Sequence, residues 1–496
     1  MGSDSPFVVA DGDACVEAVI ERVGKRIVLG LPLGLGKPVR FVNALYRRAQ
    51  QDPTIDLHII TAISMLAPQG RSSLEQRFLE PFAHRLYGDI PELEYARDVV
   101  DGQLPDNVRV SEFFFKAGSF LSHPEQQRNY VCTNYTHAVR DLMAQGVNVV
   151  GQMVAPEPGK DSGLVSLSCN PDLSLDLLPR FRALAEAGES IALVAETNRQ
   201  LPYFGRDSAV PSSHFDIMLD RQKSEYPLFS VPQMAVTAAD HAIGFYASAL
   251  VKDGGTLQVG IGSLGAALVH STILRHTRNE AWRQVFDSLE VARRNPVVGR
   301  CGGTDTFEEG LYGCSEMMVD GFIHLLNAGV LKREVFDHAG LQRLINEGRV
   351  GTEVSLATLD ALREAELIDS PLRARDVQWL SRYGIFHGDV RFRGGRLVVQ
   401  DQTLEPDLDD PVARERMELL ALGKRLQGGV VLHGGFYLGP EAFYQQLREL
   451  SPAQRDQISM TSVNYINHLY DHAFGDQKLK AAQRKQSRFI NSAMMY

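Results

Sequence analysis

A glycine-rich stretch in the second half of the sequence has the residue types of an anion-binding loop. It consists of Gly260, Ile261, Gly262, Ser263 and Leu264, between an apolar run expected to form a strand and a stretch expected to form a helix. Glycines let the backbone approach a ligand closely, and the N–H groups at a helix start favour a negatively charged group. The pattern therefore predicts a cradle for an anion or an acyl group at residues 260–264.

Two other interpretations of this loop are weighed against that prediction. With the next glycine, its letters match the dinucleotide fingerprint GxGxxG, which also requires a second strand ending in an acidic residue roughly 20 positions further on. Here the expected helix continues into the polar stretch 275–283 without such a strand. A nicotinamide site is therefore disfavoured, while a tight structural turn without a ligand stays open as the alternative.

A second glycine-rich stretch, GLPLGLGKP at residues 30–38, superficially resembles a phosphate-binding P-loop. A P-loop requires four residues between its glycines and a serine or threonine after its lysine. Gly30 and Gly36 are separated by five residues, and Pro38 follows Lys37. The pattern argues against ATP binding and leaves two equal alternatives, strand–turn–helix packing and a role in lining a substrate site.

A single carboxylate stands in the string GLYGCSEMMVDG at residues 310–321. Apolar residues at 318, 322, 325 and 326 follow helical spacing, and Ser315 is a suitable N-cap. Glu316 is therefore expected at the start of a helix, directly after a glycine-rich turn. A glutamate there is a candidate nucleophile, but an acidic side chain also stabilises a helix start through the helix dipole. Taken alone, the residues favour the dipole explanation.

The composition excludes several other classes of function. Net charge is −10, and no basic stripe longer than short pairs such as Arg47-Arg48 occurs, so nucleic-acid binding is not expected. No uncharged apolar run approaches the ~18 residues that span a bilayer, and the early acidic residues are unlike a signal peptide. The five widely spaced cysteines have neither zinc nor CxxC spacing, and HExxH and GxSxG motifs are absent. We expect no metal site and a cytoplasmic location.

The elements that would position these residues suggest two α/β domains. Apolar runs of strand length recur at 26–31, 56–66, 147–154, 190–196 and 215–219, with expected helices such as 38–50 and 134–145 between them. This alternation predicts mostly parallel sheets covered by helices. In the second half, a helix at 233–252, a strand at 256–261 and a helix at 263–276 follow the polar, proline-bounded stretch 221–232. We expect domains at 1–225 and 226–496, with an insertion at about 340–430.

Together these stretches resemble the acetyl-CoA hydrolase/transferase family, the family I CoA-transferases that include 4-hydroxybutyrate CoA-transferase-like enzymes. The likeness extends over nearly the whole chain. GLPLGLGKPVRFVNALYRRA, NYTHAVRDL, SLSCNPDLSLDLLP and NRQLPYFG resemble the first domain of the family, LQVGIGSLGAALV its CoA-contacting loop, and GCSEMMVDGFIHLLNAGVL the segment with its reactive glutamate.

The resemblance implies a role for the two candidate sites. It assigns the nucleophile that forms a glutamyl-CoA thioester to Glu316, and contact with CoA to the loop Gly260–Leu264. It implies an acyl-CoA hydrolase or a CoA-transferase acting between a short-chain acyl-CoA and a carboxylate such as acetate. No permanently bound cofactor is implied, because the CoA thioester is the substrate.

The sequence also departs from the family pattern. The sequence stops at RFINSAMMY, an expected strand, where family members continue into a glycine-rich segment that contacts CoA. The resemblance therefore implies a second domain without its C-terminal part, completed by a homodimer contact or by a complementing segment. Hydrolase or transferase activity, an inactive binding or assembly subunit, and an unrelated nucleotide-binding enzyme remain as alternatives.

Overall fold

The first sheet consists mainly of parallel strands. The computed structural model describes residues 5–70, 72–115, 118–160, 162–220, 225–467 and 477–485. Within these residues the strand order is β1-β9-β7-β5-β2-β3-β4, every neighbouring pair being parallel. These strands are β1 (Phe7–Val9), β2 (Arg26–Gly30), β3 (Asp56–Thr61), β4 (Val108–Glu112), β5 (Val149–Pro156), β7 (Ala192–Thr197) and β9 (Ile217–Leu219). Two short strands lie off this order. The strand β6 (Leu164–Ser166) pairs antiparallel with β5, and β8 (Ala209–Pro211) pairs antiparallel with β6.

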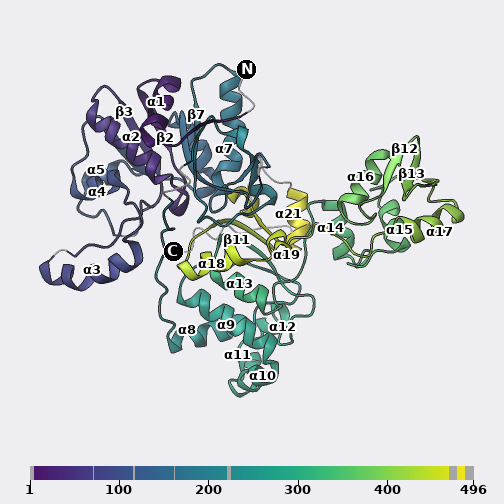
Figure 1. Cartoon of the computed structure of the whole chain (residues 1–496). Helices are drawn as coiled ribbons and strands as arrows, with labels where there is room; N and C mark the ends of the chain where they lie inside the picture. The colour runs from purple at the N-terminus through teal and green to yellow at the C-terminus, as the bar shows by residue number, and fades with distance from the viewer. Residues whose placement is uncertain are drawn as a thin grey trace.

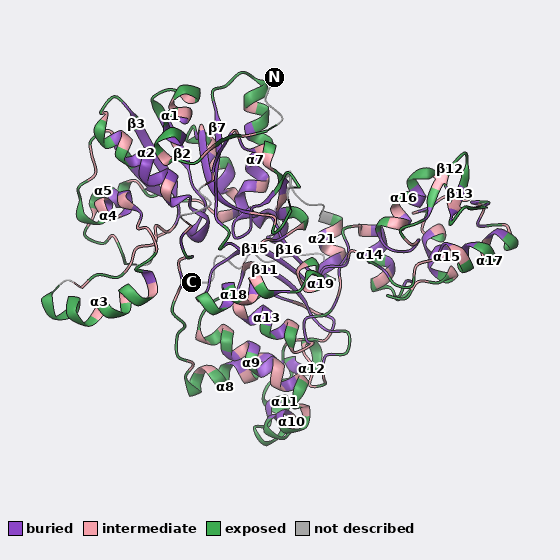
Figure 2. Cartoon of the chain, viewed as in Figure 1, coloured by how far each residue is buried: buried purple, intermediate pink, exposed green. Residues whose placement is uncertain are grey.

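Helices cover both faces of this sheet, which explains why its central strands are buried (Figures 1 and 2). Every residue of β7 is buried, as expected for a strand between two helical layers. The helices of this part are α1 (Gly12–Val23), α2 (Val39–Gln51), α3 (Ser73–Tyr87), α4 (Glu94–Asp101), α5 (Pro124–Arg128), α6 (Ala138–Ala144) and α7 (Pro171–Glu186). The helix α3 differs from the others because it projects from the body of the molecule (Figure 1).

A second parallel sheet has the strand order β10-β11-β15-β16. Its strands are β10 (Thr256–Leu257), β11 (Tyr312–Met318), β15 (Leu432–Tyr437) and β16 (Ile458–Met460). The surrounding helices are α8 (Ala238–Ser248), α9 (Ser263–Thr277), α10 (Asn279–Ser288), α11 (Val291–Arg294), α12 (Val297–Cys301), α13 (Asp320–Asn327), α18 (Glu441–Glu449), α19 (Pro452–Asp456), α20 (Val463–Ile466) and α21 (Gln477–Arg484). The expectation of α/β architecture with mostly parallel sheets is confirmed.

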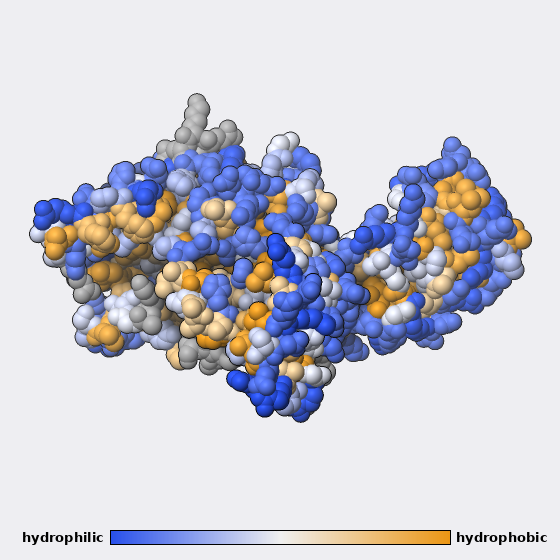
Figure 3. Space-filling model, turned by 90° about the horizontal axis from the view of Figure 1, so that it is seen from below, coloured by the Kyte–Doolittle hydropathy of each residue, from blue (hydrophilic) through white to orange (hydrophobic). Residues whose placement is uncertain are grey.

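Residues between Phe336 and Leu426 form a hydrophobic cluster of their own, which we call the satellite. It contains α14 (Ala339–Asn346), α15 (Leu356–Glu364), α16 (Ala374–Arg382), α17 (Pro411–Leu420) and an antiparallel sheet of β12 (Arg391–Arg393), β13 (Arg396–Val399) and β14 (Gln402–Leu404). The satellite stands to one side of the two sheets (Figures 1 and 3). The domain division at 225/226 and the insertion at about 340–430 stay predictions.

The structure corrects the expected position of Glu316. This residue lies inside β11 rather than at a helix start, and the following helix α13 begins four residues later, at Asp320. Pairing with β10 on one side and β15 on the other keeps residues 312–318 extended, so tertiary hydrogen bonds override the local Ser315 capping signal. Asp320 supplies the acidic residue in the first turn of the helix.

Three further expectations change in extent. The expected helix 233–252 is shortened to α8, because Thr237 caps its start by accepting a hydrogen bond from the Asp240 N–H. The expected strand 256–261 is paired only at β10 (Thr256–Leu257). The expected strand RFINSAMMY, at 488–496, lies outside the described residues. Among the described helices, none combines the length and apolar character needed to cross a bilayer.

The close contact between α8 and α9 yields a stability prediction. A Cβ atom at Gly244 would lie 2.5 Å from the backbone carbon of Ala267, so any side chain there forces the two helices apart. Although alanine favours a helix over glycine by about 1 kcal/mol, we expect Gly244→Ala to destabilise the chain by about 1–3 kcal/mol. Urea unfolding monitored by circular dichroism measures this change.

Gly299 in α12 provides the matched control, because a Cβ atom there meets nothing within 4 Å. Gly299→Ala should leave stability unchanged or raise it slightly, through the same helix propensity without the contact. Equal effects of the two substitutions would show that α8 and α9 do not pack at Gly244.

Candidate active site

Glu316 is a partly buried carboxylate in the central part of β11. Its Oε2 atom accepts a hydrogen bond of 2.6 Å from Nδ2 of Asn467, which follows α20 and is 2% exposed. Burial raises the pKa of the Glu316 carboxyl, and the Asn467 hydrogen bond acts in the opposite direction. Asn467 thus holds one carboxylate oxygen in place. It also favours the ionised form of Glu316, which burial disfavours.

The register of the second sheet brings the predicted loop level with Glu316. Leu257 of β10 pairs with Gly313 of β11, an offset of 313 − 257 = 56 residues. Continued by two residues, the same offset aligns Val259 with Ser315. The Ser315 hydroxyl lies 2.7 Å from the Met317 carbonyl oxygen and 3.3 Å from the Val259 carbonyl oxygen, so it is shared between these two acceptors. The paired residues end at Leu257, and continuing the same offset to Gly260 would bring it beside Glu316.

The start of α9 contributes backbone donors for which the described part of the chain supplies no acceptor. Gly262 occupies the N-cap position with φ 116°, a backbone conformation that residues with side chains rarely adopt, and no side chain caps the helix there. The first N–H groups of α9 belong to Ser263, Leu264 and Gly265, because the first intrahelical bond of this turn comes from Ala266 to the Gly262 carbonyl. Such groups attract an anion or a developing negative charge.

A cavity of about 340 Å³ lies at the carboxyl ends of β10, β11 and β15. Three of the predicted loop residues, Gly260, Ile261 and Gly262, line it, whereas Ser263 and Leu264 do not. Its other walls are Val259, three residues of α9 (Gly265, Ala266 and Val269), residues 231–234 with Val236, residues 319–321 and residues 438–440. The lining is mainly apolar and contains no lysine or arginine. Glu316 is not among the lining residues, but it precedes the wall residue Val319 by only three positions, roughly 10 Å of strand.

The first sheet supplies the other side of the Glu316 region. Met317 packs against the hydrophobic cores of both sheets, and Phe436 of β15 belongs to the core around α6 and α7. Asp172, at the start of α7, is 1% exposed and accepts a hydrogen bond from the Tyr135 hydroxyl. Burial raises the pKa of Asp172 well above its ordinary value, and the charge of Glu316 adds to this effect. The two carboxyl groups therefore influence each other across the contact between the sheets.

The P-loop-like stretch has a structural function in the described chain. Lys37 is 1% exposed, and its Nζ atom donates hydrogen bonds to the carbonyl oxygens of Ala62 at 2.8 Å and Ile63 at 3.0 Å. Burial lowers the pKa of this amine to about 7. The Gly36 N–H donates to Asn170 Oδ1 at 2.9 Å, beside Asp172. Packing of the strand–turn–helix unit, one of the two alternatives, accounts for these contacts.

Sequence reasoning missed Asn467 and Asp172. Asn467 is 467 − 316 = 151 residues from Glu316, and Asp172 is 316 − 172 = 144 residues away. Neither belongs to a motif of its own, although Asp172 lies inside the SLSCNPDLSLDLLP string. Asp172 could have been suspected as an acidic residue in the first turn of a helix, whereas Asn467 carried no comparable signal.

Comparisons with known proteins find only distant similarities. The sequence matches no protein-family model and no curated protein. RipA from Yersinia pestis is 16% identical over 93% of this chain and 68% of its own, with a TM-score of 0.45. A 4-hydroxybutyrate CoA-transferase from Porphyromonas gingivalis is 15% identical over the same shares, with a TM-score of 0.43. The putative alpha subunit of citrate lyase from Streptococcus mutans is 10% identical over 66% of this chain and 55% of its own, with a TM-score of 0.37.

The raised pKa of Glu316 predicts how stability depends on pH. The folded chain binds the Glu316 proton more tightly than the unfolded chain does. The stability that this protonated carboxyl contributes is fully present below the ordinary carboxyl pKa, and it is lost as pH rises through the raised pKa. Glu316→Gln cannot titrate and should lose less stability over this window. In urea unfolding at a series of pH values, the stability of the variant relative to the native chain should therefore increase with pH.

Asn467→Ala serves as the companion variant. It removes the hydrogen bond that lowers the pKa of Glu316, so the loss of stability should extend to higher pH than in the native chain. Lost packing at position 467 would lower stability equally at every pH. It can therefore be distinguished from loss of the hydrogen bond to Glu316, whose effect depends on pH. A difference between Glu316→Gln and the native chain that does not change with pH would contradict the burial of a titrating carboxyl.

Proposed function

We propose that this chain is a CoA-transferase or acyl-CoA hydrolase in which Glu316 carries the transferred group. The observation that supports this most is the contact between the Ser315 hydroxyl and the Val259 carbonyl oxygen, which joins the residue before Glu316 to the residue before Gly260. A partly buried carboxylate in the strand that leads to a mainly apolar cavity, with a glycine loop and a helix start in the cavity wall, is suited to covalent catalysis on an acyl thioester. The GCSEMMVDG and VGIGSLG strings, which resemble the corresponding family segments, support the same assignment.

Glu316 would react in balanced steps. Its carboxylate oxygen attacks the thioester carbonyl carbon, the carbon–sulfur bond breaks, and CoA leaves as a thiolate, giving a mixed anhydride. The thiolate then attacks the glutamyl carbonyl carbon and releases the donor carboxylate, which leaves a glutamyl-CoA thioester. An acceptor carboxylate such as acetate takes the CoA through a second anhydride and restores Glu316. Attack by water on an intermediate gives hydrolysis instead. A series of moderate steps thus replaces one difficult transfer.

The surroundings of Glu316 are suited to hold it for this attack. The Asn467 hydrogen bond occupies Oε2 and leaves Oε1 to form the new bond. Only the ionised carboxylate is a nucleophile, and burial reduces the ionised fraction of Glu316 by raising its pKa. The hydrogen bond from the Asn467 amide lowers this pKa and so offsets part of the effect of burial. A partly dehydrated carboxylate is a stronger nucleophile than a fully hydrated one, since less water must be displaced from it.

The loop and the cavity would bind the rest of the substrate. Backbone N–H groups of residues 260–264 would stabilise the oxyanion of each tetrahedral intermediate, an effect worth roughly 10²–10³ in rate per donor. The cavity lining has no cationic side chain, which fits an uncharged arm of an acyl thioester better than a phosphate group. Binding energy gained there, away from the reacting atoms, orients the thioester for attack.

The first functional prediction concerns Glu316. Glu316→Gln keeps the shape of the side chain and removes the nucleophile, so turnover of acyl-CoA should fall by about three orders of magnitude or more while the fold is retained. The assay incubates the chain with acetyl-, propionyl- and butyryl-CoA, with and without acetate, and follows both free thiol and acyl exchange. Thiol release without exchange identifies a hydrolase, and exchange dependent on acetate identifies a transferase.

Borohydride reduction during turnover provides the direct control, because it converts a glutamyl thioester to the alcohol and marks the residue by mass. Label at Glu316 in the native chain and its absence in Glu316→Gln are expected. Label on another carboxylate, or undiminished turnover by Glu316→Gln, would overturn the assignment.

The second functional prediction concerns the loop. A Cβ atom at Gly262 points into open space, but with φ 116° any side chain strains the backbone and projects beside the cavity. Gly262→Val should raise the apparent dissociation constant for acyl-CoA by roughly tenfold or more, because it disturbs the donors at the start of α9. Equilibrium titration with a nonhydrolysable acyl-CoA thioether measures this constant, and titration with NAD tests the dinucleotide alternative.

Gly24 provides a control matched for strain, since it has φ 79°, open space for a Cβ atom and a position after α1 in the first domain. Gly24→Val should lower stability to a similar extent and leave acyl-CoA affinity unchanged. Tight NAD binding by the native chain, or equal loss of affinity in both variants, would contradict a CoA-contacting loop.

A further inference from the structure

The residue that holds Glu316 in place is carried by a helix too short to be stable alone. Asn467 directly follows α20 (Val463–Ile466), and its backbone N–H donates a hydrogen bond of 2.7 Å to the Val463 carbonyl oxygen. A helix of one turn has no intrinsic stability in water, because the first turn fixes several residues for a single hydrogen bond. The position of the Asn467 side chain therefore depends on the contacts that hold α20 from outside.

A buried carboxylate of the first α/β unit holds the start of this helix. Asp176 in α7 is 1% exposed, and its Oδ2 atom accepts hydrogen bonds from Ser462 Oγ at 2.5 Å and from Asn464 Nδ2 at 2.9 Å. Ser462 is the N-cap of α20, and its hydroxyl oxygen accepts a hydrogen bond of 3.0 Å from the Asn464 N–H. Because Asp176 receives the hydroxyl proton, a lone pair of Ser462 Oγ is directed at the helix start.

Cationic side chains of α21 hold the other end of α20. Lys480 donates a hydrogen bond of 2.5 Å to the Asn464 carbonyl oxygen. Arg484 donates to the carbonyl oxygens of Tyr465 at 2.7 Å and Ile466 at 3.1 Å. Helices leave their last carbonyl groups without intrahelical partners, so these contacts fix the end of the turn. They cannot replace an acceptor at its start.

We propose that Asp176 is a positioning residue for the reaction of Glu316, acting through Ser462, α20 and Asn467. The inference rests on the proposed function, because it concerns the hydrogen bond that holds the reacting carboxylate. While Asp176 binds both donors, α20 presents the Asn467 amide to Glu316 Oε2 at 2.6 Å. Without this acceptor the helix loses its oriented cap, and the Asn467 amide leaves the carboxylate. The first α/β unit thereby sets the ionised fraction of a nucleophile that lies in the second sheet.

Position and charge at Asp176 have opposite effects on Glu316. The Asn467 hydrogen bond lowers the pKa of Glu316, so its loss raises that pKa. Removal of a nearby negative charge instead lowers the pKa of a carboxyl group. The direction of the change therefore separates the two roles. The other charged groups around this turn are the same in every variant of Asp176, and they are Asp172, Asp207, Lys480 and Arg484.

The pH dependence of kcat/KM tests the proposal, with whichever of acetyl-, propionyl- and butyryl-CoA the native chain uses best. Asp176→Ala should move the acidic limb of the profile to higher pH, lowering kcat/KM about tenfold at the acidic end and little at the alkaline end. Asp176→Asn keeps an acceptor oxygen without the charge and should restore most of the native profile. Asn467→Ala should shift the limb as Asp176→Ala does, and the double variant should show no further shift.

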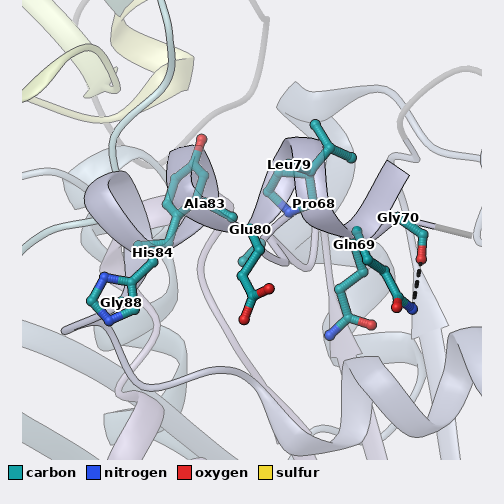
Figure 4. Close-up of a pocket in the computed structure, with 11 residues that line it drawn as sticks. Pro68, Gln69, Gly70, Leu79, Glu80, Ala83, His84 and Gly88 are labelled. Carbon is teal, nitrogen blue, oxygen red and sulfur yellow. Dashed lines mark hydrogen bonds between the residues drawn. The ribbon is translucent and has the colours of Figure 1, made fainter. Parts of the chain in front are cut away.

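Two carboxylates elsewhere in the chain provide matched controls. Asp376 in α16 is 4% exposed and accepts a hydrogen bond of 2.8 Å from the Arg373 N–H, so Asp376→Ala loses a buried acceptor without touching α20. Glu80 of α3 lines a cavity of about 400 Å³ beside the segment 67–70, away from β11 (Figures 1 and 4). Glu80→Ala thus removes a carboxylate of the first unit at a remote place. Both variants should keep the native pH profile, although Asp376→Ala lowers stability.

Urea unfolding at a series of pH values measures the same effect without any turnover. The native chain, Asp176→Ala and Asp176→Asn are each compared with and without Glu316→Gln, so that the difference isolates the titration of Glu316. The stability contributed by protonated Glu316 is lost as pH rises through its pKa in the folded chain. This loss should therefore extend to higher pH in Asp176→Ala and return to the native range in Asp176→Asn. Ser462→Ala, which removes one of the two hydrogen bonds, repeats the test with a milder change.

The outcomes distinguish this inference from the proposed function. A native chain that turns over no acyl-CoA would refute the proposed function, whereas the unfolding series would still decide the role of Asp176. A pKa of Glu316 that is unchanged or lowered in Asp176→Ala would overturn the inference. So would an equal loss of kcat/KM at every pH, since Asp176 would then act only on stability. Circular dichroism establishes that each variant is folded.

Discussion

The position of β11 between two parallel strands is the constraint on which the candidate site depends. Pairing with β10 sets the register at Leu257 and Gly313, and pairing with β15 holds residues 313–318 from the other side. This second contact is close, since a Cβ atom at Gly435 would lie 2.7 Å from the Glu316 carbonyl oxygen. Glycine at that position lets the backbones approach, and the ladder in turn sets the direction of the carboxylate.

Holding a carboxylate in a partly buried strand has an electrostatic cost. Burial disfavours the charged form of Glu316 and, more strongly, that of Asp172, which lies in the first α/β unit. Against this cost the structure sets a small number of hydrogen bonds, from Asn467 to Glu316 and from Tyr135 to Asp172. Burial also raises the carboxyl pKa values of Glu112, Glu196 and Asp207, so this cost is not confined to the Glu316 region.

The two sheets meet at this point through apolar as well as polar contacts. Phe436 of β15 packs beside α6 and α7, and Ser462 and Asn464 donate hydrogen bonds to Asp176 of α7 at 2.5 Å and 2.9 Å. The buried contacts between the two units therefore surround the region of Glu316. The satellite and α3 lie on opposite sides of the two sheets, away from β11 (Figure 1).

The sequence by itself determined the alternation of strands and helices, the parallel sheets and the glycine loop at residues 260–264, because periodicity, glycine and capping residues act over a few positions. It misplaced Glu316 at a helix start, since Ser315 and the preceding glycines give a local helix signal that only pairing with β10 and β15 overrides. Tertiary structure alone brought Asn467 to the carboxylate, from 151 residues away. A contact between distant residues depends on how the sheets pack, and no local pattern in one sequence records it.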